Sequence, residues 1–115
     1  MENKYAKAEK LFKALADENR IKILAMLVDG EKFAGSLLQE LEVSQPTLSH
    51  HMKTLCESGL VYARKDGKWI YYSIPDESRD MAFDILAEIM ISADERKAFV
   101  TKKKTRRSSD NIVIL

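Results

Sequence analysis

Apolar residues recur every three to four positions along much of this chain, which is the spacing of one face of an α-helix. The first such segment has an apolar stripe made of Tyr5, Ala8, Leu11, Phe12 and Leu15. Asp17 is placed to cap a second helix, and Gly30 is placed to end it. The pattern predicts helices over residues 3–16, 18–28, 34–41, 45–58 and 77–99.

Two segments between the fourth and fifth helices alternate apolar and polar residues, as β-strands do. They are Leu60–Arg64 and Trp69–Ile74, and the Asp-Gly pair between them is a strong hairpin signal. The third and fourth helices are joined by a short turn, which is the helix-turn-helix pattern. We therefore predict a mainly α fold with a β-hairpin wing: a winged helix-turn-helix with flanking N- and C-terminal helices.

Residues 44–55 look like a helix that reads DNA. Ser44 is a good N-cap, and Pro46 falls in the first turn, where its missing N–H costs nothing. One face of this helix is apolar and consists of Leu48, Met52 and Leu55. The opposite face is polar and consists of Thr47, His50, Lys53 and Thr54. Side chains of this kind can reach base edges and phosphates.

Two groups of residues are the expected DNA contacts. The helix supplies Ser44, Gln45, Thr47, Ser49, His50 and Lys53. The hairpin supplies the basic residues Arg64, Lys65 and Lys68, which flank its tip and are expected to reach the minor groove or the backbone. For both groups the alternative is an ordinary solvated surface. His51 is expected at the edge of the core, hydrogen-bonded to backbone, and Trp69, Tyr71 and Tyr72 are expected to pack rather than stack on bases.

The 115 residues fit a single domain, and the net charge of +1 says little by itself. Charge is unevenly distributed, however. Residues 75–96 contain two basic and seven acidic residues, whereas residues 97–107 contain six basic residues and no acidic one. The domain is expected to span residues 1–100, followed by a flexible basic tail over residues 101–115. The basic residues of that tail could contact phosphates or could simply be solvated.

The chain has one cysteine and no apolar run near the ~20 residues that a membrane span needs. A single cysteine cannot form an internal disulfide, which fits a reducing cytoplasm. We therefore expect a cytoplasmic protein without a membrane partner. No Gly-rich phosphate loop, Cys-His pair or converging carboxylates are visible, so the chain is not expected to be an enzyme.

Three separated stretches resemble the ArsR/SmtB family of transcriptional repressors. They are Leu15–Leu24, Ser44–Lys53 and Gly59–Val61, in the same order as in that family. The resemblance implies a homodimer that binds an inverted-repeat operator in double-stranded DNA. It also implies that the first and last helices pack across the two-fold axis. The expected interface residues are Tyr5, Leu11, Phe12, Ile85, Leu86, Ile89 and Met90.

The sensing sites of the family are mostly missing from this chain. Phe33 and Gly35 stand where the arsenic-type site has cysteines. The zinc-type positions read Asp76, Ser78, Ile89 and Ser92, and a single carboxylate does not make a zinc site. No cofactor and no family-type metal site are therefore predicted.

The effector that would release DNA stays open at this stage. Candidates are a metal held by Asp76, Asp80, Asp84 and Glu88, a redox signal through Cys56, another ligand, or none. For Cys56 the default is an inert, partly buried thiol, because Glu57 beside it opposes the thiolate. The leading function is a dimeric repressor, and the alternative is a winged helix that binds only protein.

Overall fold

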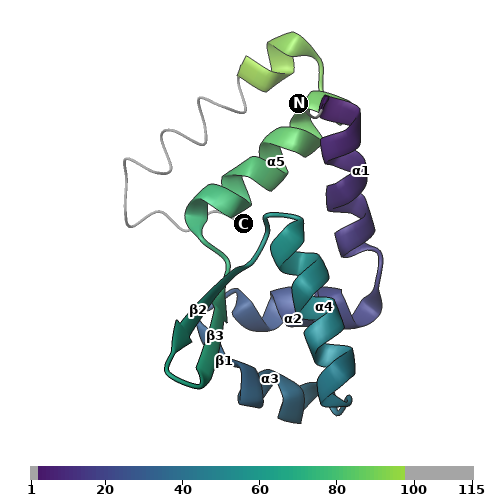
Figure 1. Cartoon of the computed structure of the whole chain (residues 1–115). Coiled ribbons are helices and arrows are strands. Elements are labelled where there is room, and N and C mark those ends of the chain that lie inside the picture. The colour runs from purple at the N-terminus through teal and green to yellow at the C-terminus, as the bar shows by residue number, and fades with distance from the viewer. Residues whose placement is uncertain (1–2, 98–115) are drawn as a thin grey trace.

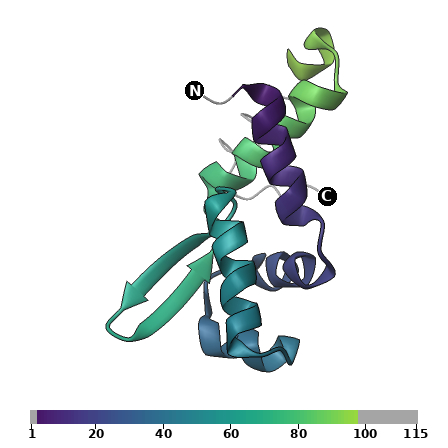
Figure 2. The same ribbon diagram turned by 45° about the vertical axis from the view of Figure 1, so that its right-hand side comes forward.

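The computed structural model describes residues 3–97 (Figure 1). Its elements in chain order are α1 (Lys4–Leu15), α2 (Glu18–Leu27), β1 (Lys32–Phe33), α3 (Ala34–Leu41), α4 (Gln45–Glu57), β2 (Tyr62–Asp66), β3 (Trp69–Ser73) and α5 (Asp76–Met90). Helices α1 and α5 contact each other at one end of the molecule, and the β2–β3 hairpin extends away from the helices (Figures 1 and 2). The predicted winged helix-turn-helix with flanking helices is confirmed.

Three helices begin at side-chain caps that their sequences specify locally. Asn3, Asp17 and Ser44 accept hydrogen bonds from the backbone N–H three residues ahead, at 2.8, 3.1 and 3.2 Å. The bond from the Arg20 backbone lowers the pKa of the Asp17 carboxyl. Each cap satisfies an N–H that has no partner within the helix. The predicted starts of α2 and α4 are therefore confirmed.

The core lies where the first four helices meet the start of the wing. Its most deeply buried large side chains are Leu11, Ile23, Leu27, Leu37, Met52 and Leu55. Burying each side chain of this size contributes about 1.5–3 kcal/mol. Two of the six come from the apolar face of α4, so that face fixes the helix to the body of the protein as its periodicity predicted.

The sheet differs from the predicted two-stranded hairpin in two ways. β1 adds a third strand, so the antiparallel order is β1-β3-β2. In addition, the strand bounds shift: β2 is Tyr62–Asp66 instead of Leu60–Arg64, and β3 ends at Ser73 instead of Ile74. Leu60 and Val61 are buried in the core before β2 starts. Asp66 pairs with Trp69, which leaves a two-residue turn whose first residue, Gly67, has φ +63°. That conformation favours glycine.

The last helix is shorter than predicted. α5 ends at Met90 instead of continuing to residue 99, and a separate helical segment occupies residues 93–97. Ser92 accepts from the Glu95 N–H at 3.3 Å and donates to the Glu95 carboxylate at 2.9 Å, which makes it a new N-cap. The predicted boundary at residue 100 and the basic tail lie outside the described residues. None of the helices in residues 3–97 combines the length and apolar composition that a bilayer crossing requires.

Candidate nucleic-acid interface

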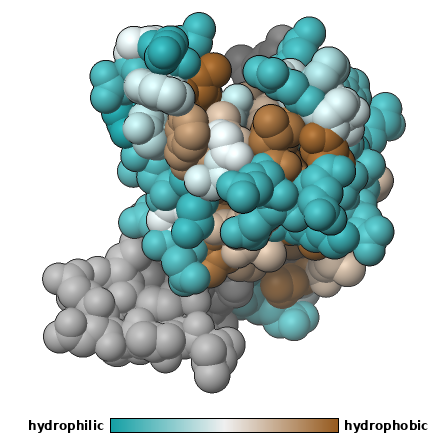
Figure 3. Space-filling view, turned by 90° about the horizontal axis from the view of Figure 1, so that it is seen from below, coloured by the Kyte–Doolittle hydropathy of each residue, from teal (hydrophilic) through white to brown (hydrophobic). Residues whose placement is uncertain are grey.

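Helix α4 separates its buried and exposed side chains cleanly. Leu48, His51, Met52 and Leu55 are buried. The six predicted DNA-contacting residues of this segment are all exposed: Ser44, Gln45, Thr47, Ser49, His50 and Lys53. Figure 3 shows the face to which α3 and the start of α4 contribute, where polar side chains in teal surround a smaller apolar area. The structure therefore leaves the predicted DNA-contacting face of α4 polar and exposed to solvent.

The first turn of α4 has its own hydrogen-bond arrangement. The Ser44 hydroxyl donates to the Thr47 hydroxyl at 2.8 Å while accepting from the Thr47 N–H. Further along the helix, the Thr54 hydroxyl donates to the His50 carbonyl at 3.1 Å. Thr54 is therefore turned back onto its own helix, whereas Thr47 and His50 remain exposed. The exposed start of a helix also favours negative charge, such as a DNA phosphate.

The tip of the wing is basic, but Arg64, one of the three predicted contacts, is bound by a carboxylate. Lys65 and Lys68 are exposed at the end of the hairpin. Arg64, in contrast, binds the Glu31 carboxylate through two hydrogen bonds of 2.9 and 2.8 Å and lies 4.5 Å from the centre of the Tyr71 ring. This pairing lowers the pKa of Glu31 and raises the pKa of Arg64. Arg64 therefore links β2 to Glu31, the residue before β1, and does not extend toward the tip of the hairpin.

Aromatic packing also connects the wing to the start of α3. The Phe33 ring contacts the rings of Trp69 and Tyr71 with centroid distances of 5.2 and 5.7 Å. The Trp69 contact has an edge-to-face geometry, which is favourable for aromatic pairs. Trp69 and Tyr71 thus pack within the wing, as the sequence predicted. The orientation of the wing relative to α3 follows from these contacts and from the Arg64–Glu31 pair.

Comparison with known proteins gives a consistent result. The model of the bacterial regulatory protein arsR family matches residues 17–63. The transcriptional activator HlyU of Vibrio cholerae is 37% identical over 95 residues, which cover 83% of this chain and 88% of HlyU. The chain belongs to the ArsR family. It is therefore a DNA-binding transcriptional regulator and not an enzyme.

Other members of the ArsR family agree in sequence and structure. The arsenical resistance operon repressor of Escherichia coli is 35% identical over 99 residues, or 85% of each chain. The solved structure of V. cholerae HlyU has a TM-score of 0.62 and 39% identity, and it covers 80% of this chain and all of HlyU. One relative is thus named an activator and the other a repressor, so membership alone leaves the direction of regulation undecided.

The arsenic-type position of this ArsR-family regulator does not fit a metalloid. Phe33 and Gly35 provide no donor atom there, and the Phe33 ring covers Gly35. A Cβ built at Gly35 would lie 2.5 Å from the Phe33 ring, so a side chain at this position would require the ring to move. Aromatic packing of Phe33 occupies this position.

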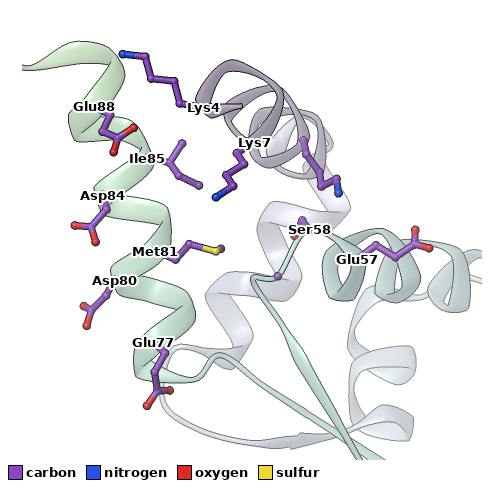
Figure 4. Close-up of a pocket in the computed structure, with 12 residues that line it drawn as sticks. Lys4, Lys7, Glu57, Ser58, Glu77, Asp80, Met81, Asp84, Ile85 and Glu88 are labelled. Atoms are coloured by element: carbon purple, nitrogen blue, oxygen red, sulfur yellow. The ribbon is translucent and has the colours of Figure 1, made fainter. Parts of the chain in front are cut away.

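The acidic residues of α5 do not converge on a point. A groove of about 770 Å³ is bordered by α1, α5 and the end of α4, and Met81 and Ile85 line it (Figure 4). Glu77, Asp80, Asp84 and Glu88 follow one another along α5, and lysines of α1 line the other side. Within residues 3–97, no three His, Cys, Asp or Glu side chains are placed to hold a metal ion.

The single cysteine is poorly suited to react. Cys56 is partly buried, and burial together with the charge of Glu57 raises the pKa of its thiol. The reactive form of cysteine is the thiolate, so a raised pKa reduces the reactive fraction at neutral pH. This environment matches the inert thiol expected from the sequence.

The predicted dimer residues fall into three groups by their exposure. Tyr5, Phe12, Ile89 and Met90 are exposed, with Tyr5 at 67% and Met90 at 75%, and Ile85 and Leu86 are half-buried. Leu11 is only 1% exposed and belongs to the core of the single chain, so it offers almost no surface to a second copy. Three of the exposed members, Tyr5, Phe12 and Ile89, line an apolar hollow of about 460 Å³ along α1.

Proposed function

We propose that the chain is a homodimeric repressor that binds an inverted-repeat operator and leaves it when an effector binds. The observation that supports this is the presence of two separate surfaces on one small domain. One is the polar outer face of α4 beside the wing, and the other is the exposed apolar face of α1 and α5. A second copy covering the apolar face would leave both α4 helices free. Two-fold related helices match a DNA site with the same symmetry.

In this proposal the outer face of α4 enters the major groove. Gln45 can pair with adenine, Thr47 can contact a thymine methyl, and His50 can hydrogen-bond a base edge or a phosphate. Ser44, Ser49 and Lys53 would contact the backbone, as would Lys65 and Lys68 of the wing. We do not assign Arg64 to the DNA, because its guanidinium is already bound by Glu31.

The apolar face accounts for the proposed homodimer. Exposed large apolar side chains that gather in one place commonly mark an interface. Replacing Met90 by Lys should therefore dissociate the dimer, as measured by sedimentation equilibrium. Val28→Lys is the matched control, because Val28 is also strongly exposed, at 65%, but lies at the end of α2. Equal dissociation by both variants, or a wild-type monomer, would contradict the proposed dimer.

DNA reading is tested with the region upstream of the chain's own gene. Fluorescence anisotropy should show binding of that DNA at concentrations where an unrelated duplex is not bound. His50→Ala should weaken operator binding by about 1–3 kcal/mol, whereas Lys22→Ala, on the exposed side of α2, should leave it unchanged. A protein that binds neither DNA specifically would favour the alternative, a winged helix that interacts with protein.

The effector is proposed to be something other than a metalloid held by thiolates on α3. Phe33 and Gly35 supply no ligand atoms at that position, and the thiol of Cys56 is disfavoured as a redox sensor by its raised pKa. Elemental analysis of the purified protein, followed by anisotropy with a panel of metal ions and oxidants, tests this directly. Release of operator DNA by one agent at stoichiometric concentration would identify the effector class.

A further inference from the structure

The guanidinium of Arg20 joins three helices. Arg20 lies in the first turn of α2, and its Nε donates to the carbonyl of Ala14 at 2.7 Å. Its Nη2 donates to the carbonyl of Lys13 at 3.0 Å. Its Nη1 lies 3.2 Å from Nδ1 of His51 on α4. One planar group therefore holds the end of α1 and the buried side of the recognition helix at the same time.

The Arg20 guanidinium determines which ring nitrogen of His51 acts as the acceptor. Arginine has donors only, so Nδ1 of His51 must accept, and a neutral ring then carries its hydrogen on Nε2. Nε2 lies 3.9 Å from the Asp17 carboxylate, which is the N-cap of α2. His51 is 7% exposed, while its neighbour His50 is exposed on the polar face. The sequence analysis predicted the core-edge position of His51, which is confirmed. Its predicted backbone partner was wrong, because the partner is the Arg20 side chain.

The α1 carbonyls that Arg20 binds lie beside the exposed apolar face of α1 and α5. The carbonyls of Lys13 and Ala14 belong to the last turn of α1, where acceptors have no N–H four residues ahead within the helix. The Lys13 carbonyl also accepts from the Ala16 N–H at 3.2 Å. Phe12, Lys13 and Ala16, in and just after the same turn, line the hollow that we propose a second copy covers. A displacement of this turn would therefore move two of the three groups that Arg20 binds.

We infer that Arg20 is a positioning residue that couples the α1 end of the dimer face to the orientation of α4 through His51. This inference depends on the proposed operator binding. His50 precedes His51 on the same helix, so a rotation of α4 that follows the Arg20 contact shifts the reading surface directly.

The decisive experiment compares operator DNA with an unrelated duplex. Arg20→Lys removes the planar guanidinium but keeps the positive charge. His51→Leu removes the Nδ1 acceptor and replaces the ring by an apolar side chain of similar size. Each should weaken operator binding about tenfold, while binding of the unrelated duplex changes by less than about twofold. His51→Asn should restore operator binding to within about threefold of wild type, because its Oδ1 takes the place of Nδ1.

The double variant and thermal melting complete the test. If the two residues act together, the double variant Arg20→Lys, His51→Leu should bind operator no more weakly than the single variant with the larger loss of affinity. Melting in the absence of DNA shows that each variant is folded. A loss that is equal on both DNAs, that adds in the double variant, or that His51→Asn does not restore would mean a purely structural role and would overturn the inference.

A second readout separates this inference from the proposed function. Long-range ¹⁵N–¹H NMR spectra of the free protein report which ring nitrogen of His51 carries the hydrogen. We expect the Nε2–H form in the wild-type protein and a changed Nδ1 signal in Arg20→Lys. The Nδ1–H form would overturn the inference even if operator binding is found. The expected form in a protein that binds no operator would instead show that the proposed function has failed, and the positioning role with it.

Discussion

Gly35 should be a position where alanine destabilises the protein, although alanine is the better helix former. Gly35 lies in the first turn of α3, where Gly→Ala alone would contribute at most about 0.5–1 kcal/mol of stability. A Cβ there would come within 2.5 Å of one Phe33 ring atom and 3.1 Å of two others. The ring would have to leave its contacts with Trp69 and Tyr71. Forcing a packed group aside costs about 1–3 kcal/mol.

The expected net effect of Gly35→Ala is a loss of about 1–2 kcal/mol of unfolding free energy, measured by urea denaturation. The sign should reverse when the ring is absent. In a Phe33→Ala background the collision disappears, so Gly35→Ala should stabilise by up to about 0.5–1 kcal/mol. If Gly35→Ala stabilises both backgrounds equally, the Phe33 ring does not constrain this position, and the collision argued from the structure is wrong.

Four further predictions concern the wing, the thiol, the core and the effector. Because Arg64 lowers the pKa of Glu31, the pair stabilises the fold at neutral pH, and this stabilisation is lost as the pH falls through the folded-state pKa; an NMR titration of Arg64→Gln should show the Glu31 pKa returning upward. Cys56 should react slowly with a thiol reagent, and Glu57→Gln should accelerate the reaction because Glu57 helps to raise the thiol pKa; an unchanged rate would argue against that cause. Leu55→Ala, at a fully buried position of α4, should cost about 2–5 kcal/mol of stability in thermal or urea unfolding. Arsenite should leave operator binding unchanged in anisotropy, and stoichiometric release would show that ligands other than the α3 positions hold it.

Short-range signals in the sequence determined most of the helical architecture. The caps of α2 and α4 involve a side chain and a backbone N–H only three residues apart. The burial of Leu48, Met52 and Leu55 follows from helical periodicity, so the outward polar face of α4 followed as well. Even the break after α5 has a local signal, because Ser92 caps the following helical segment through the Glu95 N–H three residues ahead.

Only the tertiary structure determined which residues of a given sequence pattern are buried and which distant residues contact each other. Leu11 and Phe12 belong to one apolar stripe, and only the packing of α1 buries the first and exposes the second. Arg64 and Glu31 are 33 residues apart, and Arg20 and His51 are 31 apart, so no periodicity could pair them. β1 is two residues long and exists because β3 lies beside it. Local spacing specifies the elements, whereas contacts between distant residues determine how the reading surface is held.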